Sequence, residues 1–182
     1  MTISITENIQ LALTGREHAE QLFGAIDNNR SHLSVFLPWV NNMQTVANVE
    51  SYLIGCELLY EQKKEVSFVI LLDEVAVGRI GLHHWNPPNK TAAIGYWLSH
   101  DAEGKGIITL CCKWLIQYGF EQMDLNRIEI KAAVKNRRSQ AIPLKFNFTQ
   151  EGVLRQAEWV NHEFVDLILF SLLKAEWPNP QR

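Results

Sequence analysis

The most constraining stretch of the sequence is an apolar strand pattern that leads through two glycines into a helix pattern. The strand pattern covers 92–98, the glycines are Gly104 and Gly106, and apolar residues at helical spacing begin at Ile107. A second strand pattern, 127–134, follows at the distance that a parallel βαβ crossover requires. Glycines at a helix start let backbone N–H groups approach an anion, and the helix dipole favours phosphate there. The stretch therefore predicts an anion site, with the rest of the chain as its frame.

Length and composition indicate a single domain spanning 1–182. The chain has 182 residues, of which 47% are hydrophobic and 20% charged, and such a chain can bury a core. The net charge of −3 argues against a dedicated nucleic-acid partner. No apolar run reaches the length of a membrane span, and the first residues lack a signal-peptide pattern, so we expect a cytoplasmic protein without a membrane partner. Two of the three cysteines, Cys111 and Cys112, are adjacent, which fits buried thiols better than a disulfide framework.

Hydrophobic periodicity predicts a mixed α/β fold with a mostly antiparallel, seven-stranded sheet and about four helices. One parallel crossover is expected at the glycine turn. Asp73-Glu74 predicts a hairpin turn, and Glu61 to Glu65 predicts a solvated turn after a long helix. The expected strands are 3–13, 66–72, 75–83, 91–98, 127–135, 152–158 and 163–173, and the expected helices are 14–26, 46–62, 107–123 and 137–146.

Two familiar phosphate-binding motifs fit the glycine turn poorly. A P-loop requires an earlier glycine and a Ser or Thr directly after the lysine, and neither accompanies Gly104-Lys105-Gly106. A Rossmann fingerprint needs a third glycine where Thr109 stands and an acidic residue where Lys135 and Asn136 stand. A bare Gly-x-Gly also fits a simple structural turn. The glycines alone therefore leave the ligand open.

Five segments that occur in a fixed order carry more information than the glycines. They are Ile94-Gly95-Tyr96-Trp97-Leu98, Gly104-Lys105-Gly106-Ile107-Ile108-Thr109, Asn126-Arg127-Ile128-Glu129-Ile130-Lys131, Asn136-Arg137-Arg138-Ser139-Gln140-Ala141 and Lys145-Phe146-Asn147-Phe148-Thr149-Gln150-Glu151-Gly152. Each is weak by itself, but the combination is specific and spans nearly the whole chain. It resembles the GCN5-related N-acetyltransferase (GNAT) superfamily, and most of all the subgroup that acetylates the N-termini of ribosomal proteins.

The resemblance implies that acetyl-CoA binds as a cosubstrate. In the family, the pantetheine arm pairs with a strand backbone and enters where two parallel strands, here 91–98 and 127–135, splay apart. The glycine loop offers N–H groups to the pyrophosphate without a metal, and no His, Cys, Asp or Glu spacing suggests a metal site. The cofactor-binding residues implied are Tyr96, Trp97, Leu98, Glu103, Gly104, Lys105, Gly106, Ile107 and Asn136.

Two positions depart from the family pattern. Asp101 stands where the family has Gln or Arg, and we expect a modest effect on affinity because the loop works through its backbone. Asn147 stands where the family has the glycine of Leu-Gly-Phe, and Asn is the residue that best tolerates a left-handed conformation after glycine. Both departures are compatible with the fold.

Acetyl transfer requires a group that accepts the proton of the amine and a group that assists the departing thiolate. Many superfamily members use a tyrosine late in the chain as the acid, but no tyrosine lies between Arg127 and Arg182. The ribosomal-protein subgroup instead uses a serine and a glutamate, which implies Ser139 near the sulfur and Glu158 near the acceptor. Ser139 also fits a helix-capping role, and Glu158 also fits a solvated strand end.

Other polar and aromatic residues are weaker candidates. Arg137 and Arg138 could meet the nucleotide 3′-phosphate, and the aromatic segment 36–39 could line a substrate cleft or simply pack. His83 and His84 end a strand that flanks the cleft, and either could act as a base. Because neighbouring strand residues point to opposite faces, at most one of the two is expected to face the cleft.

The expected function is acetyl-CoA-dependent transfer to a primary amine by direct attack in a ternary complex. The expected acceptor is the α-amino terminus of a protein such as a ribosomal protein. Two alternatives stay open: a polyamine or aminoglycoside acetyltransferase, and a non-catalytic acyl-CoA-binding module. A dinucleotide-dependent oxidoreductase is a remote third. The sequence leaves the oligomeric state open; a homodimer is compatible with the aromatic residues and with the resemblance, because dimers are common in the subgroup.

Overall fold

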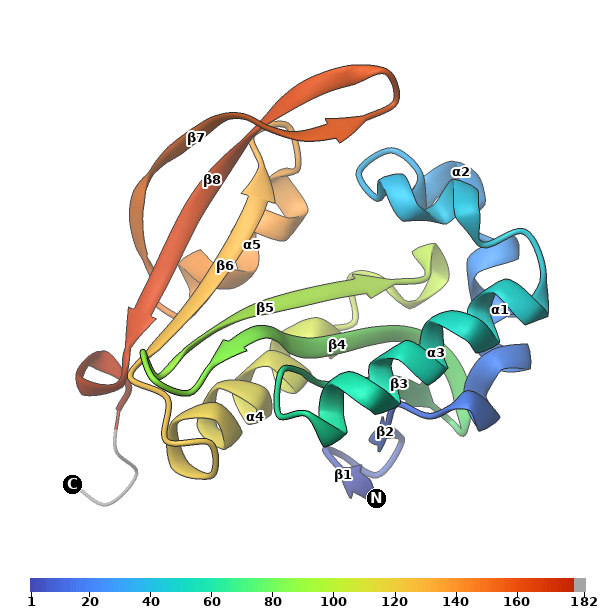
Figure 1. Cartoon of the computed structure of the whole chain (residues 1–182), viewed down its shortest axis with the longest axis horizontal. Helices are drawn as coiled ribbons and strands as arrows, with labels where there is room; N and C mark the ends of the chain where they lie inside the picture. The colour runs from blue at the N-terminus through green and yellow to red at the C-terminus, as the bar shows by residue number, and fades with distance from the viewer. Residues whose placement is uncertain (179–182) are drawn as a thin grey trace.

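An eight-stranded mixed sheet organises residues 1–178, the part of the chain that the computed structural model describes (Figure 1). The spatial order of the strands is β1-β2-β3-β4-β5-β6-β8-β7. The strands are β1 (Thr2–Ser4), β2 (Ile9–Leu13), β3 (Val66–Leu72), β4 (Val75–Asn86), β5 (Thr91–Leu98), β6 (Arg127–Ala133), β7 (Thr149–Val160) and β8 (Glu163–Leu173). The α-helices are α1 (Ala19–Asp27), α2 (Arg30–Leu33), α3 (Val46–Glu61), α4 (Ile107–Glu121) and α5 (Arg137–Lys145).

The one parallel strand pair lies where the sequence predicts it, and its two strands separate before they end. β5 and β6 pair from Thr91 opposite Arg127 to Ile94 opposite Ile130. Beyond that point β5 continues to Leu98 alongside β4, and β6 continues alongside β8. Figure 1 shows β5 and β6 diverging toward the side of α2. The predicted splay is therefore confirmed.

The structure has one strand and one short helix more than expected. The stretch 3–13 is a hairpin of β1 and β2 and not a single strand, because the polar residues between them turn the chain: Thr6 Oγ1 accepts a hydrogen bond from the Ile9 N–H at 3.1 Å. The additional helix is the one-turn helix α2, which ends at Leu33.

Positive backbone φ angles appear where the sequence predicts turns. Asp73 and Glu74 have φ of 49° and 66° and join β3 to β4 in a tight hairpin, and Asn147 has φ of 57° after α5. Gly104 and Gly106 both have φ of 75°. Apart from Glu74, these residues are glycine, asparagine and aspartate, the types that tolerate a left-handed backbone at the least cost.

Two hydrophobic clusters cover opposite faces of the sheet. The larger one packs α4 against the central strands and includes the fully buried Phe68, Leu82 and Leu115. The smaller one packs α1 and α3 on the other face and includes Leu53 and Trp97. Within residues 1–178, no helix is long and apolar enough to cross a membrane.

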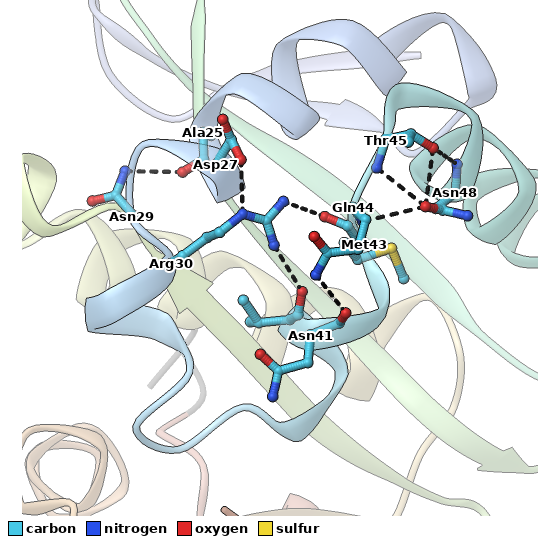
Figure 2. A network of polar contacts seen from close by, with 10 residues as sticks. Ala25, Asp27, Asn29, Arg30, Asn41, Met43, Gln44, Thr45 and Asn48 are labelled. Atoms are coloured by element: carbon cyan, nitrogen blue, oxygen red, sulfur yellow. Dashed lines mark hydrogen bonds and ion pairs between the residues drawn. The ribbon is translucent and has the colours of Figure 1, made fainter.

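Arg30 fixes the segment that connects α1 to α3 (Figure 2). Its Nε donates to Asp27 Oδ1 at 2.7 Å, its Nη1 donates to the Val40 carbonyl at 3.1 Å, and its Nη2 donates to the Met43 carbonyl. Hydrogen bonds from a charged donor are stronger than neutral ones. The guanidinium therefore holds the stretch 36–43 in one conformation.

Replacing Arg30 by methionine should lower the free energy of unfolding by about 1–3 kcal/mol, because the part-buried carbonyls of Val40 and Met43 lose hydrogen bonds from a charged donor. Urea denaturation followed by circular dichroism measures the change. Lys113→Met on the exposed face of α4 is the matched control and should stay within about 0.5 kcal/mol of the wild type. Equal losses in the two variants would contradict the role given to Arg30.

Candidate active site

Two cavities meet at the splay between β5 and β6. The loop cavity, of about 860 Å³, is bordered by the glycine turn and the start of α4. The sheet cavity, of about 420 Å³, is bordered by α3 and the central strands. Both are lined by Phe36, Leu37, Tyr96, Trp97, Asn136 and Ser139. The loop cavity is also lined by Leu98, Glu103, Gly104, Gly106 and Ile107, and the sheet cavity by Glu158.

The loop cavity contains backbone donors suited to a phosphate. Gly106 is the N-cap of α4 and supplies no side-chain cap, so the first N–H groups of the helix stay unsatisfied by the cap residue. The positive φ of Gly104 and Gly106 turns the backbone of the loop into the shape that presents such groups. The exposed Lys105 side chain does not line the cavity, so its expected contribution is limited to its backbone.

Glu103 links two helices at the loop cavity. Its carboxylate accepts a hydrogen bond from Arg138 Nη1 on α5 and lies 3.1 Å from Nε2 of His32 on α2. Because the Arg138 guanidinium offsets the negative charge of Glu103, a phosphate in the loop would meet less repulsion. Arg137 and Arg138 both line the cavity.

Ser139 lies where the two cavities meet, and two residues position it. Asn136 is the N-cap of α5, and its Oδ1 accepts from the Ser139 N–H at 3.1 Å. The Tyr96 hydroxyl donates to the Ser139 carbonyl at 2.8 Å and lies 3.2 Å from Ser139 Oγ. Burial raises the pKa of Tyr96 and keeps this hydroxyl protonated. The cap of α5 is therefore Asn136, and the serine hydroxyl remains available for another role.

The sequence gives no sign of the contact between Tyr96 and Ser139. The tyrosine of many superfamily members lies late in the chain, whereas the hydroxyl that reaches Ser139 comes from β5, 43 positions earlier. Only the fold brings the two together, and no local pattern signals the pair.

Glu158 reaches the sheet cavity because β7 bulges just before it. Leu154 pairs with Leu167 and Glu158 with Val165, so the three residues 155–157 oppose a single residue of β8. Such a bulge bends a strand and redirects the side chains that follow it. The Glu158 carboxylate is half-buried in the cavity, and burial raises its pKa.

The sheet cavity also contains both histidines, which corrects the expectation that at most one faces the cleft. The pairing of β4 with β5 is interrupted between His83 and Asn86, and His84 has φ of 53°. The strand alternation on which the expectation rested fails at this irregularity. His83 and His84 consequently both line the cavity.

Arg79 lies below the same cavity in a polar cluster that the sequence did not reveal. It is buried, and its Nη1 donates to the Tyr52 hydroxyl at 2.7 Å while its Nη2 donates to Ser67 Oγ at 2.8 Å. Lys131 is a second cation on the cavity wall, whereas Glu158 is the one carboxylate among its lining residues within 1–178. Arg79 is in turn paired with a carboxylate behind the cavity wall, because its Nη2 lies 3.9 Å from Glu65 Oε1.

A glycine loop joined to a second cavity by a strand splay is the arrangement that the resemblance to the GNAT superfamily predicts. Residues 9–149 match a family model described as an acetyltransferase (GNAT) domain. The chain is 36% identical over 177 residues, 97% of each chain, to "Putative ribosomal N-acetyltransferase YdaF" of Bacillus subtilis (strain 168). It is 31% identical over 170 residues to the ribosomal-protein-serine acetyltransferase of Escherichia coli (strain K12), covering 93% of this chain and 95% of the relative.

A solved structure gives the same result. The ribosomal alpha-N-protein acetyltransferase RimL, solved in complex with coenzyme A, superposes with a TM-score of 0.91 at 25% identity, covering 95% of this chain and 98% of that one. This chain therefore belongs to the GNAT family, whose members transfer acetyl groups from acetyl-CoA, and it is an N-acetyltransferase.

Glu158→Gln should not lower the stability of the protein at neutral pH and should raise it slightly. A carboxyl whose folded-state pKa is raised destabilises the fold above that pKa, where burial opposes the charged form. The amide removes this cost, so the difference should disappear as the pH falls below the ordinary pKa of glutamate. Thermal melts at several pH values measure it. A variant less stable than the wild type at neutral pH would show that the carboxylate is instead stabilised.

Proposed function

We propose that this protein transfers the acetyl group of acetyl-CoA to the N-terminal α-amino group of a protein, such as a ribosomal protein. One observation carries the proposal: the loop cavity and the sheet cavity meet at Tyr96, Asn136 and Ser139. A thioester that enters from one cavity would face an amine that enters from the other. The names of the relatives support the ribosomal substrate.

The loop cavity fits acetyl-CoA along its length. The pyrophosphate would accept hydrogen bonds from the N–H groups of 104–107, as helix N-termini offer to phosphates, whereas the Glu103 N–H already donates to the His100 carbonyl at 3.1 Å. Beyond Ile94, β5 no longer pairs with β6. The backbone groups on that edge of β5 could therefore pair with the pantetheine amides. The Oδ1 of Asn136 is used by Ser139, which leaves the Asn136 amide N–H groups for the same arm.

The reaction would proceed at the junction of the cavities by direct attack. The amine nitrogen forms a bond to the thioester carbonyl carbon, and the C–S bond then breaks with its electron pair on sulfur. Glu158 would accept the proton that the nitrogen loses, and Ser139 Oγ would donate a hydrogen bond to the thiolate. The Tyr96 hydroxyl, 3.2 Å from that Oγ, would support the serine in this role.

Glu158→Gln should reduce kcat/KM for an N-terminal peptide at least ~10-fold, because removing a general base costs on that scale. The dissociation constant of acetyl-CoA, measured by calorimetry, should stay unchanged, because Glu158 lines the sheet cavity and not the loop cavity. An unchanged rate would remove Glu158 from the mechanism.

A mixed pool of peptides and polyamines should yield N-terminally acetylated peptides when acetyl-CoA is added, as detected by mass spectrometry. Preferential acetylation of spermidine or of an aminoglycoside would replace the proposal by a small-molecule acetyltransferase. Tight binding of coenzyme A without any turnover would indicate an acyl-CoA-binding module.

We also propose a cytoplasmic location and a homodimer. Trp159 and Phe164 are exposed on the β7–β8 hairpin with ring centroids 4.6 Å apart. Exposed aromatic pairs of this kind are typical of contact surfaces. Sedimentation of the wild type and of a Trp159→Ser variant would test the dimer.

A further inference from the structure

A carboxylate–imidazole pair borders the sheet cavity and has no part in the reaction outlined above. Glu65 directly precedes β3, and its Oε2 lies 2.9 Å from Nδ1 of His83 on β4. Because an ionised carboxylate can only accept, Nδ1 carries the hydrogen of this contact, and Nε2 is the nitrogen that has a lone pair in the neutral imidazole. The expectation that Glu65 belongs to a solvated turn is wrong, because this residue is 8% exposed.

The imidazole lies at the start of the splay. A Cβ atom built on Gly95 would be 3.1 Å from Cδ2 and 3.2 Å from Nε2 of His83, closer than such contacts normally are. Gly95 is the first residue of β5 after the pairing with β6 ends at Ile94, and it precedes Tyr96 at the junction of the cavities. The missing side chain at Gly95 therefore makes room for the imidazole at the junction.

The groups around Glu65 favour the ionised form of its carboxyl. Burial opposes the charge of Glu65, but hydrogen bonds from His83 and Ser67, together with the charge of Arg79, hold its pKa below the usual value. Arg79 Nη2 lies 3.9 Å from Glu65 Oε1. The other titratable groups that line the cavity are Tyr52 on α3, His84 on β4, Tyr96 on β5, Lys131 on β6 and Glu158 on β7.

A peptide acceptor must lose two protons from its nitrogen. Free α-amino groups titrate at about 7.7–8.0, so the acceptor arrives at neutral pH mainly as an ammonium ion, which has no lone pair for attack. One proton must leave before the N–C bond forms and a second must leave as it forms. Glu158 accounts for only one of these transfers.

We infer that Nε2 of His83 accepts the first proton, that of the acceptor ammonium, and that Glu65 is the positioning residue that orients the imidazole for this step. The nitrogen keeps its electron pair, attacks the thioester and releases its second proton to Glu158. The C–S electron pair leaves on sulfur. Of the two protons, one ends on the coenzyme A thiol and the other in solvent. This inference rests on the proposed function.

The test is the pH dependence of kcat/KM for an N-terminal peptide in the wild type, His83→Gln, Glu65→Gln and Glu158→Gln. At a pH of about 6.5 the His83→Gln variant should lose about 10-fold or more, and at a pH of about 9.5 less than about 3-fold, because solvent has then deprotonated the acceptor. Glu65→Gln should give a smaller loss with the same trend. Glu158→Gln should lose activity at both pH values, because its proton appears only during attack.

The controls distinguish a failure of this inference from a failure of the proposed function. His84 lines the same cavity, so His84→Gln is the matched control. The assignment to His83 would be overturned if the loss of kcat/KM became smaller with rising pH in His84→Gln but not in His83→Gln. A His83→Gln loss that is equal at every pH, or no loss at all, would also overturn it. A wild type that acetylates no N-terminal peptide would instead refute the proposed function, whatever the variants do. Calorimetry of acetyl-CoA binding should give the same affinity for all variants.

Discussion

The chemistry of this protein depends on two parallel strands that stop pairing before either strand ends. β5 stays bonded to β4, and β6 stays bonded to β8, so the sheet opens between them beyond Ile94 and Ile130 (Figure 1). Backbone N–H and C=O groups on the opened edges have lost their strand partner, and buried groups of this kind require a substitute. In the proposed function, an extended ligand with amide groups, such as the pantetheine arm, would supply one. The two cavities share lining residues at the opening, so the proposal has the reactants meet there.

Several separate structural features meet at this opening. The glycine turn prepares an anion site at the start of α4, and Asn136 and Tyr96 together hold Ser139 at the junction. A bulge in β7 turns Glu158 inward, and an irregularity in β4 after His83 brings His84 to the same cavity. Arg30 fixes the segment that supplies the remaining wall (Figure 2). Irregularities in regular strands are thus what bring polar groups into an otherwise apolar sheet.

The sequence predicted the features that depend on local chemistry. Gly104, Gly106 and Asn147 adopt the left-handed conformations that their residue types suggest, and Asp73-Glu74 forms the expected hairpin. The parallel crossover and its splay follow from the strand–turn–helix–strand pattern. The whole fold was therefore accessible except for the β1–β2 hairpin and α2, which are too short to leave a periodic pattern.

The contacts that build the site were less accessible, because they join residues far apart in the chain. The hydroxyl of Tyr96 meets Ser139 across 43 positions, and Glu65 meets His83 from a charged run that looks solvated. Strand alternation failed at His84, since a bulge cannot be detected from periodicity alone. Pairing and bulges are set by the whole sheet, and a single sequence does not reveal them.

The central claim is that the loop cavity and the sheet cavity form one continuous path through the splay. The most direct measurement is the affinity of a conjugate in which coenzyme A is joined through an acetyl bridge to the amino terminus of a peptide. The conjugate should bind about 100-fold more tightly than coenzyme A alone. Its peptide part is already tethered, so it binds the sheet cavity without a second loss of translational and rotational freedom. An affinity no higher than that of coenzyme A would show that the two cavities do not connect, and would contradict the account.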